Sequence, residues 1–190
     1  MTVSLTTPIS ETDIRSLTAG DYVTITGTIF TARDAAHSML AGGGEAPCDL
    51  RGAVIYHCGP VMLNVDGEWR VMAAGPTTSI REEPYMAALI ERFSLRGIIG
   101  KGGMGEDTLA ACRQFGCVYL HAVGGAAQVL AQSIKDVPAV FLKEEFGSPE
   151  AIWEMRVVDF PALVTIDAHG ESLHKRVESE ARKRLNRLLV

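Results

Sequence analysis

The chain has 190 residues, of which 47% are hydrophobic and 22% charged, and its formal net charge is −5. This composition is typical of a globular protein, and we expect residues 1–190 to form a single domain. An acidic chain lacks the basic face that general binding to nucleic acids or membrane surfaces requires. No apolar run approaches the ~20 residues that span a bilayer, and the first ten residues lack a signal-peptide pattern. We therefore predict a cytoplasmic protein with no nucleic-acid or membrane partner.

The first half of the chain predicts strands and turns around one helix. In chain order we expect a strand at residues 21–30, a helix at 32–40, a short strand at 52–60 and a hairpin at 61–74. Thr31 is placed to cap the helix, and the glycines after it would end it. Asp66 and Gly67 are the strongest hairpin signal in the sequence. This half therefore favours antiparallel strands, followed by a helix at 84–93.

From residue 97 onward, strand and helix patterns alternate. Strands are expected at residues 97–100, 117–123, 138–142, 155–160 and 161–167, and helices at 106–116, 124–134 and 171–188, with a short helical turn at 148–153. Such alternation favours parallel strands joined by crossover helices. Taken together, the two halves predict an α/β domain with mixed sheets, layered β/β/α, and a C-terminal helix.

Hydroxyl groups and a guanidinium follow an apolar stretch at "AAGPTTSIREEP", residues 73–84. One interpretation is structural: Thr77, Thr78 and Ser79 cap the next helix while Arg81 lies in solvent. The other is functional, because helix N-termini and arginine forks bind carboxylates. This stretch alone leaves both interpretations open.

Cationic side chains follow three separate apolar strands. Arg33 comes after residues 21–30, Arg81 lies in the stretch above, and Lys101 follows "GIIG" within a glycine-rich loop. Taken alone, Lys101 is equally compatible with a solvated loop lysine. Because ligands bind at the strand ends of α/β sheets, the three cations together predict a site for a dicarboxylate.

Other catalytic motifs are lacking in the sequence. The four cysteines, Cys48, Cys58, Cys112 and Cys117, include no C-x-x-C pair, so we expect reduced thiols and no metal bound by this chain alone. The five histidines match no metal spacing and are expected to be structural. His37 is the exception to examine, since it lies one helical turn after Arg33. A site with anion binders but no electrophile looks incomplete, and a second chain would complete it.

Five segments together carry a family resemblance: "GTIFTARDAAH", "GPTTSIR", "GKGGMG", "VYLHAVGGAAQVLAQSI" and "VVDFPALVTIDAHGESL". In this order they resemble the β subunit, or C-terminal domain, of class I fumarate hydratases and L(+)-tartrate dehydratases. The resemblance covers residues 5–173. It implies a swivelling β/β/α domain and an active site shared with an α subunit, which carries a [4Fe–4S] cluster held by its own three cysteines.

The resemblance also implies roles for four residues. Arg33 and Arg81 match the family's substrate-carboxylate ligands, and Lys101 matches a lysine at the substrate. Thr77 matches a threonine near the substrate that is a candidate base. One segment departs from the family pattern, because Ile80 stands where fumarases often have glycine and residues 82–83 are Glu-Glu instead of Met-Asp.

The expected function is therefore the β subunit of an iron–sulfur hydro-lyase that hydrates fumarate to (S)-malate. L(+)-tartrate dehydration and mesaconate hydration are alternatives within the class. A non-catalytic dicarboxylate-binding module is an alternative from another class. The sequence leaves the oligomeric state open, including a homodimer of the isolated chain.

Overall fold

The computed structural model describes residues 2–189. Its strands are β1 (Thr2–Thr6), β2 (Tyr22–Ala32), β3 (Val54–His57), β4 (Val61–Val65), β5 (Glu68–Ala73), β6 (Gly97–Gly100), β7 (Val118–His121), β8 (Ile134–Phe141) and β9 (Ile152–Ile166). Its helices are α1 (Glu11–Ser16), α2 (Asp34–Ala41), the 3₁₀-helix η1 (Ser79–Glu82), α3 (Glu83–Phe93), α4 (Glu106–Phe115), α5 (Ala127–Gln132), α6 (Lys143–Phe146) and α7 (Leu173–Leu188). None of the helices within this range has the length and apolar character needed to cross a bilayer.

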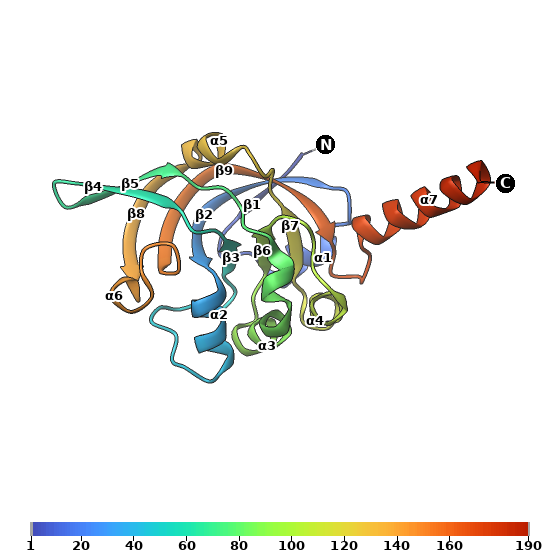
Figure 1. The fold of residues 1–190 in the computed structure, drawn as a ribbon. Helices are drawn as coiled ribbons and strands as arrows, with labels where there is room; N and C mark the ends of the chain where they lie inside the picture. Colours follow the sequence, from blue (N-terminus) through green and yellow to red (C-terminus); the bar gives the residue numbers. More distant parts are fainter. Residues whose placement is uncertain (1, 190) are drawn as a thin grey trace.

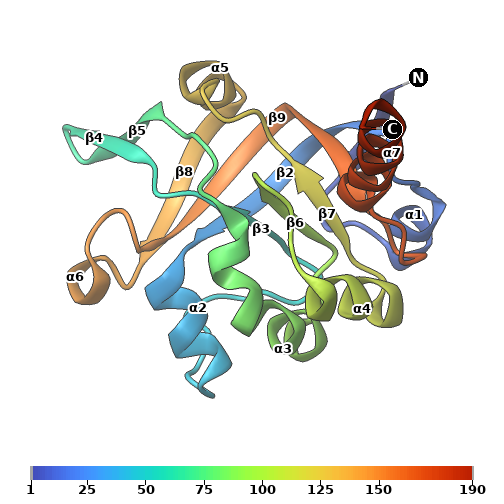
Figure 2. The same cartoon turned by 45° about the vertical axis from the view of Figure 1, so that its right-hand side comes forward.

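Seven strands form one mixed sheet in the order β1-β2-β3-β6-β7-β9-β8, and β2 also pairs with β9. The strands β1, β2, β3, β6 and β7 are parallel, whereas β9 runs antiparallel to β2, β7 and β8. Because β9 contacts both β2 and β7, the sheet closes into a ring. Figure 2 shows β8, β9 and β2 as one layer, β3, β6 and β7 as the next, and α2, α3 and α4 as the third. The predicted mixed α/β fold in three layers is confirmed.

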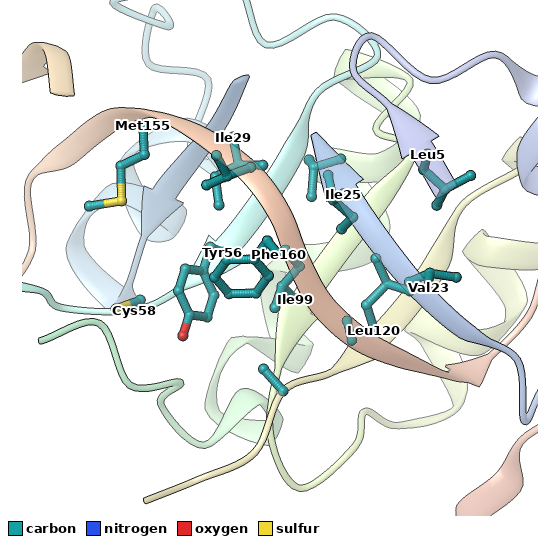
Figure 3. Packing of buried hydrophobic residues seen from close by; sticks show 14 of the residues in the cluster. Leu5, Val23, Ile25, Ile29, Tyr56, Cys58, Ile99, Leu120, Met155 and Phe160 are labelled. Carbon is teal, nitrogen blue, oxygen red and sulfur yellow. The ribbon is translucent and has the colours of Figure 1, made fainter. Parts of the chain in front are cut away.

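Two hydrophobic clusters follow from this layering. The first fills the inside of the ring, where Ile25, Tyr56, Ile99 and Phe160 come together from four different strands (Figure 3). The second lies between the sheet and the helices α2, α3 and α4. By contrast, α7 has no buried residue and extends away from the body (Figure 1). The strands that carry the candidate site are therefore packed on both faces, which holds their ends in fixed positions.

Several expectations about strand pairing are wrong. The first half is not mainly antiparallel, because α2 and the loop after it allow β3 to pair in parallel with β2. Only the β4–β5 hairpin, which turns at Asp66 and Gly67, is antiparallel there, as predicted for that segment. The strand β8 is antiparallel to β9 instead of joining the parallel set. The strands expected at 155–160 and 161–167 are one continuous strand, β9.

Two expected helix signals also have another role. Thr31 lies in β2 and does not cap α2; its hydroxyl donates to the Ala151 carbonyl at 3.2 Å and accepts from the Trp153 amide at 3.0 Å. Residues 148–150 form a turn without a helix, after which β9 begins at Ile152. At Thr31 the long strand β9 uses the hydroxyl that local propensity assigns to a cap, and at Ser148 it uses the backbone carbonyl, which accepts from the Trp153 indole at 2.9 Å.

The carboxyl ends of the parallel strands define one edge of the sheet. Since β2, β3, β6 and β7 are parallel neighbours, the residues that follow them lie in a row at this edge. These residues include Arg33 after β2, Lys101 after β6 and the strand-terminal His57 and His121. The topology thus places the predicted cations where ligands of parallel sheets bind.

Candidate active site

Arg33 lies between the end of β2 and the start of α2, with its side chain 22% exposed. Its Nη1 is 3.3 Å from Glu150 Oε1, and its Nη2 is 3.9 Å from Asp34 Oδ2. The guanidinium occupies space that Gly59 leaves open, because a Cβ atom there would come within 2.8 Å of Nη1. Its Nε is buried and has no hydrogen-bond partner among the described residues. Arg33 is therefore held in place while part of its donor capacity remains unused.

Arg81, in η1, reaches the same carboxylate from the other side. Its Nη2 donates to Asp34 Oδ2 at 2.8 Å, and its side chain is 56% exposed. Asp34 thus lies between the guanidiniums of Arg33 and Arg81, although 47 residues separate Asp34 from Arg81 along the chain. The two arginines that the sequence assigned to carboxylate binding do converge on one carboxylate.

Thr77 and Lys101 are held together by backbone hydrogen bonds. The Lys101 amide donates to the Thr77 carbonyl at 3.3 Å, and the Ser79 amide donates to the Lys101 carbonyl at 3.0 Å. The Thr77 amide donates to the His57 carbonyl at 2.7 Å, which anchors this segment to β3. Within residues 2–189, Lys101 has no carboxylate within ion-pair distance, and its side chain extends along Gly124.

The capping interpretation of residues 77–79 is wrong. The helix α3 begins after Glu82, and neither it nor η1 has a side-chain cap. The Ser79 hydroxyl instead points into the protein, where it contacts His57 and Tyr119. The segment of residues 77–82 therefore contacts two of the predicted site regions. Thr77 is bonded to Lys101, and Arg81 is bonded to Asp34. The functional roles of these side chains remain predictions.

A fully buried carboxyl group lies beneath the arginines. Glu82 is 0% exposed, and neither of its oxygens has a hydrogen-bond partner of good geometry among the described residues. Its Oε2 is 3.4 Å from Nδ1 of His37, which is also 0% exposed. The same Nδ1 lies 2.8 Å from the Arg33 carbonyl, so Nδ1 carries the proton and donates, since a carbonyl only accepts.

A second buried histidine, His57, packs against His37. The ring of His57 meets that of His37 edge to face, with centroids 4.9 Å apart. Its Nδ1 lies 2.9 Å from the Ser79 hydroxyl, to which Tyr119 donates at 2.9 Å. This arrangement lets Ser79 donate to His57 Nδ1. Gly100 makes room for it, because a Cβ there would overlap the Ser79 Oγ.

Burial sets the charge of these groups. Desolvation raises the pKa of Glu82 to about 7, and the neighbouring Asp34 adds to the shift, while Arg81 opposes it. Desolvation lowers the pKa of His37 to about 4, and it also holds the pKa of His57 well below its ordinary value. Both imidazoles are therefore neutral at pH 7. The positive charge of the site comes from its arginines and its lysine.

The sequence did not reveal most of these buried polar side chains. Glu82 looks like a surface residue, because glutamate is rarely fully buried. Its neighbour Glu83 does behave as a polar linker: its carboxylate accepts from the Gly105 and Thr108 amides at the start of α4. The sequence signal was His37, four residues after Arg33; Arg33 precedes α2 in an extended conformation, and its carbonyl accepts from His37.

An iron–sulfur cluster does not fit the residues of this chain. No group of three or more His, Cys, Asp or Glu side chains in residues 2–189 is arranged to hold a metal. Burial raises the pKa of Cys58 to about 12 and that of Cys48 to about 11, which keeps both thiols protonated.

Comparisons with known proteins find relatives over nearly the whole of this chain. A provisionally named class I fumarate hydratase of Geobacillus stearothermophilus is 52% identical over 185 residues, which are 97% of this chain and 36% of that protein. A provisionally named L(+)-tartrate dehydratase β subunit of Methanocaldococcus jannaschii is 39% identical over 95% of each chain. The L(+)-tartrate dehydratase β subunit of Escherichia coli K12 is 36% identical over 94% of this chain and 90% of its own.

The chain therefore spans about a third of the Geobacillus protein but nearly the full length of the two β subunits. The family described as "Fumarase C-terminus" matches residues 1–177. The family resemblance drawn from the motifs is confirmed: this chain belongs to the fumarase C-terminus family.

Proposed function

We propose that this chain is the β subunit of a hydro-lyase that interconverts fumarate and (S)-malate. The observation that carries the proposal is the convergence of Arg33 and Arg81 on the single carboxylate of Asp34. Two guanidiniums at a strand edge that already share one carboxylate suit a substrate carboxylate. The family and its hydro-lyase relatives support the same activity.

The chemistry explains why a cationic pocket is needed. Removing water from malate requires loss of a proton from the carbon next to a carboxylate, and negative charge then develops on that carboxylate. Arg33, Arg81 and Lys101 would stabilise this charge more strongly than that of the ground state. In this proposal Thr77 lies beside the reacting carbon as the candidate base, and Lys101 neutralises charge beside it.

The other half of the active site belongs to a partner in this proposal. The described cysteines form no metal-binding group, and in this proposal an α subunit would hold a [4Fe–4S] cluster, which would supply a Lewis acid for the leaving hydroxyl. The residues of the β subunit bind and orient the carboxylates and exclude water. The assembled protein would act in the cytoplasm, as part of the tricarboxylic acid cycle when fumarate is its substrate.

L(+)-tartrate is the second candidate substrate. Two relatives that this chain matches over nearly their full length are named as tartrate dehydratase β subunits. Ile80, 51% exposed beside Arg81, is where the chain departs from the fumarase pattern that the resemblance implied. Isoleucine is larger than the glycine of that pattern and would narrow the space near a substrate carbon. Differences in pocket shape of this kind let enzymes distinguish similar substrates.

The deciding experiment is the substrate profile of the assembled enzyme. The chain is co-expressed with its cluster-bearing partner, reconstituted anaerobically and assayed with fumarate, (S)-malate, L(+)-tartrate and mesaconate. We expect activity only when both chains are present, with fumarate and malate preferred. A preference for tartrate would select the second candidate. Binding of dicarboxylates without turnover by any assembly would leave the chain as a binding module and contradict the proposal.

A further inference from the structure

Two separate bridges join the segments that carry Arg33 and Arg81. The outer bridge is Asp34, which lies at the surface between the two guanidiniums. The inner bridge is fully buried: His37 donates to the Arg33 carbonyl and lies 3.4 Å from Glu82, the residue after Arg81. An arriving substrate carboxylate can replace the outer bridge, whereas it cannot reach the inner one.

The inner bridge has an unusual number of unsatisfied polar atoms. The Nε2 atoms of His37 and His57, both oxygens of Glu82 and Nε of Arg33 are buried without a partner among residues 2–189. Native proteins leave few such groups, and those that occur call for an explanation. An ionised carboxylate in this position would be costly, but a neutral carboxylic acid is tolerated. A cluster this polar and this closed is not explained by packing alone.

We propose that Glu82 and His37 form a buried positioning pair that holds Arg33 and Arg81 at the separation that lets both bind one substrate carboxylate, and that Glu82 does so as a neutral carboxylic acid. The inference rests on the proposed function, since the separation matters only for a substrate that both arginines bind. Neither Glu82 nor His37 touches that substrate. Both act through the arginines.

The surroundings of Glu82 explain why its charge matters. Arg81 flanks it on its own element, while Arg33, Asp34 and His37 face it from the start of α2. Glu150 faces the cluster from the turn before β9, and the neutral His57 lies behind His37. If Glu82 lost its proton, a third carboxylate would join Asp34 and Glu150 in competing for two guanidiniums. The substrate would then meet a less positive pocket.

The test compares pH profiles in the assembled enzyme. KM for fumarate is measured from pH 6 to pH 8.5 for wild type, Glu82→Gln and the control Glu91→Gln, which removes an exposed carboxylate from α3. We expect the wild-type and control KM to rise about tenfold over this range as a buried charge forms near the substrate. For Glu82→Gln, which cannot ionise, we expect KM to change by less than about twofold. Coinciding profiles for wild type and Glu82→Gln would overturn the positioning pair.

A second measurement needs no partner and no substrate. In the isolated full chain, carbon-detected NMR follows the carboxyl groups, and the backbone and guanidinium signals of Arg33 and Arg81 are followed in parallel. We expect Glu82 to titrate near neutral pH and both arginines to shift with the same midpoint, an effect absent in Glu82→Gln. Arginine signals that do not follow Glu82 would overturn the inference. An assembled wild type without hydro-lyase activity would instead overturn the proposed function, and the NMR titration would still decide whether the pair exists.

Discussion

Asp34 Oδ2 accepts a hydrogen bond of 2.8 Å from Nη2 of Arg81, which lies 47 residues later in the chain. This contact shows that the Arg81 guanidinium can receive a carboxylate at the edge of the sheet. If Arg81 binds substrate as proposed, the protein supplies its own carboxylate to the same guanidinium. A substrate carboxylate would then compete with Asp34 for Arg81.

Replacing Asp34 tests this competition. We expect Asp34→Asn to bind succinate about two- to fivefold more tightly than wild type in the isolated chain, because exposed ion pairs of this kind are weak. Isothermal titration or NMR shift titration would measure the affinity. Glu144→Gln, which removes a carboxylate from the remote exposed pair with Lys143, is the control and should have no effect. Equal or weaker binding by Asp34→Asn would argue against a shared position.

Removing either arginine should impair turnover without unfolding the chain. We expect Arg33→Ala and Arg81→Ala each to lower kcat/KM in the assembled enzyme by about 30-fold or more, on the scale of ~2–5 kcal/mol for lost charge pairs in binding sites. Arg184→Ala, an exposed change on α7, is the matched control. Thermal unfolding verifies that each variant is folded. Wild-type rates in both site variants would show that the pocket has been placed incorrectly.

The close approach of Ser79 to Gly100 predicts that a larger residue at position 100 lowers the stability of the fold. A Cβ at residue 100 would overlap the Ser79 Oγ and come within 3.0 Å of the Tyr119 hydroxyl. We expect Gly100→Ala to lower the free energy of unfolding by about 1–3 kcal/mol, as overpacked cores do. In Ser79→Ala the overlapping oxygen is gone, so the same change should cost less there. Urea denaturation of the two single variants and of the double variant gives a double-mutant cycle. If the two losses in the free energy of unfolding simply add, the contact between residue 100 and Ser79 is contradicted.

The buried carboxyl group predicts how stability depends on pH. Because burial raises the pKa of Glu82 from 4.5 to about 7, the folded chain keeps a proton that the unfolded chain loses in this range. The contribution of Glu82 to the free energy of unfolding is fully present below pH 4.5. It falls as the pH rises to 7, by about 3 kcal/mol in total. The free energy of unfolding of Glu82→Gln, relative to that of wild type, should therefore rise by about 3 kcal/mol between pH 4.5 and pH 7.5.

His37 contributes in the opposite direction. Its pKa is lowered from 6.5 to about 4, so the unfolded chain binds the extra proton and stability falls as pH drops through this range. In wild type the two contributions oppose each other between about pH 4.5 and pH 6.5. Urea denaturation at three pH values would measure both slopes. A parallel pH dependence for wild type and Glu82→Gln would mean that Glu82 is ionised in the folded protein.

Local signals were enough to find the cations but not the groups that hold them. Arg33 and Lys101 follow apolar strands directly, but the parallel pairing of β2, β3 and β6 that brings them to one edge was not predicted around Arg33, where the pattern favoured antiparallel strands. The pairing of β2 with β9 joins segments about 130 residues apart and leaves no local trace. The sequence suggested a break between Phe160 and Pro161, but β9 continues through both residues, and Asp159 just before them adopts a φ of 51°. Tertiary pairing here overrides propensity.

The ring closure by β9 has a consequence for biosynthesis. Glu150 and Ala151, which hold Arg33 and Thr31, lie late in the chain, and β9 cannot pair with β2 until residue 166 has been synthesised. Since contacts of such long sequence separation form slowly, Arg33 acquires its ion pair with Glu150 only late in synthesis. A messenger truncated before Glu150 would yield a chain whose Arg33 lacks this support.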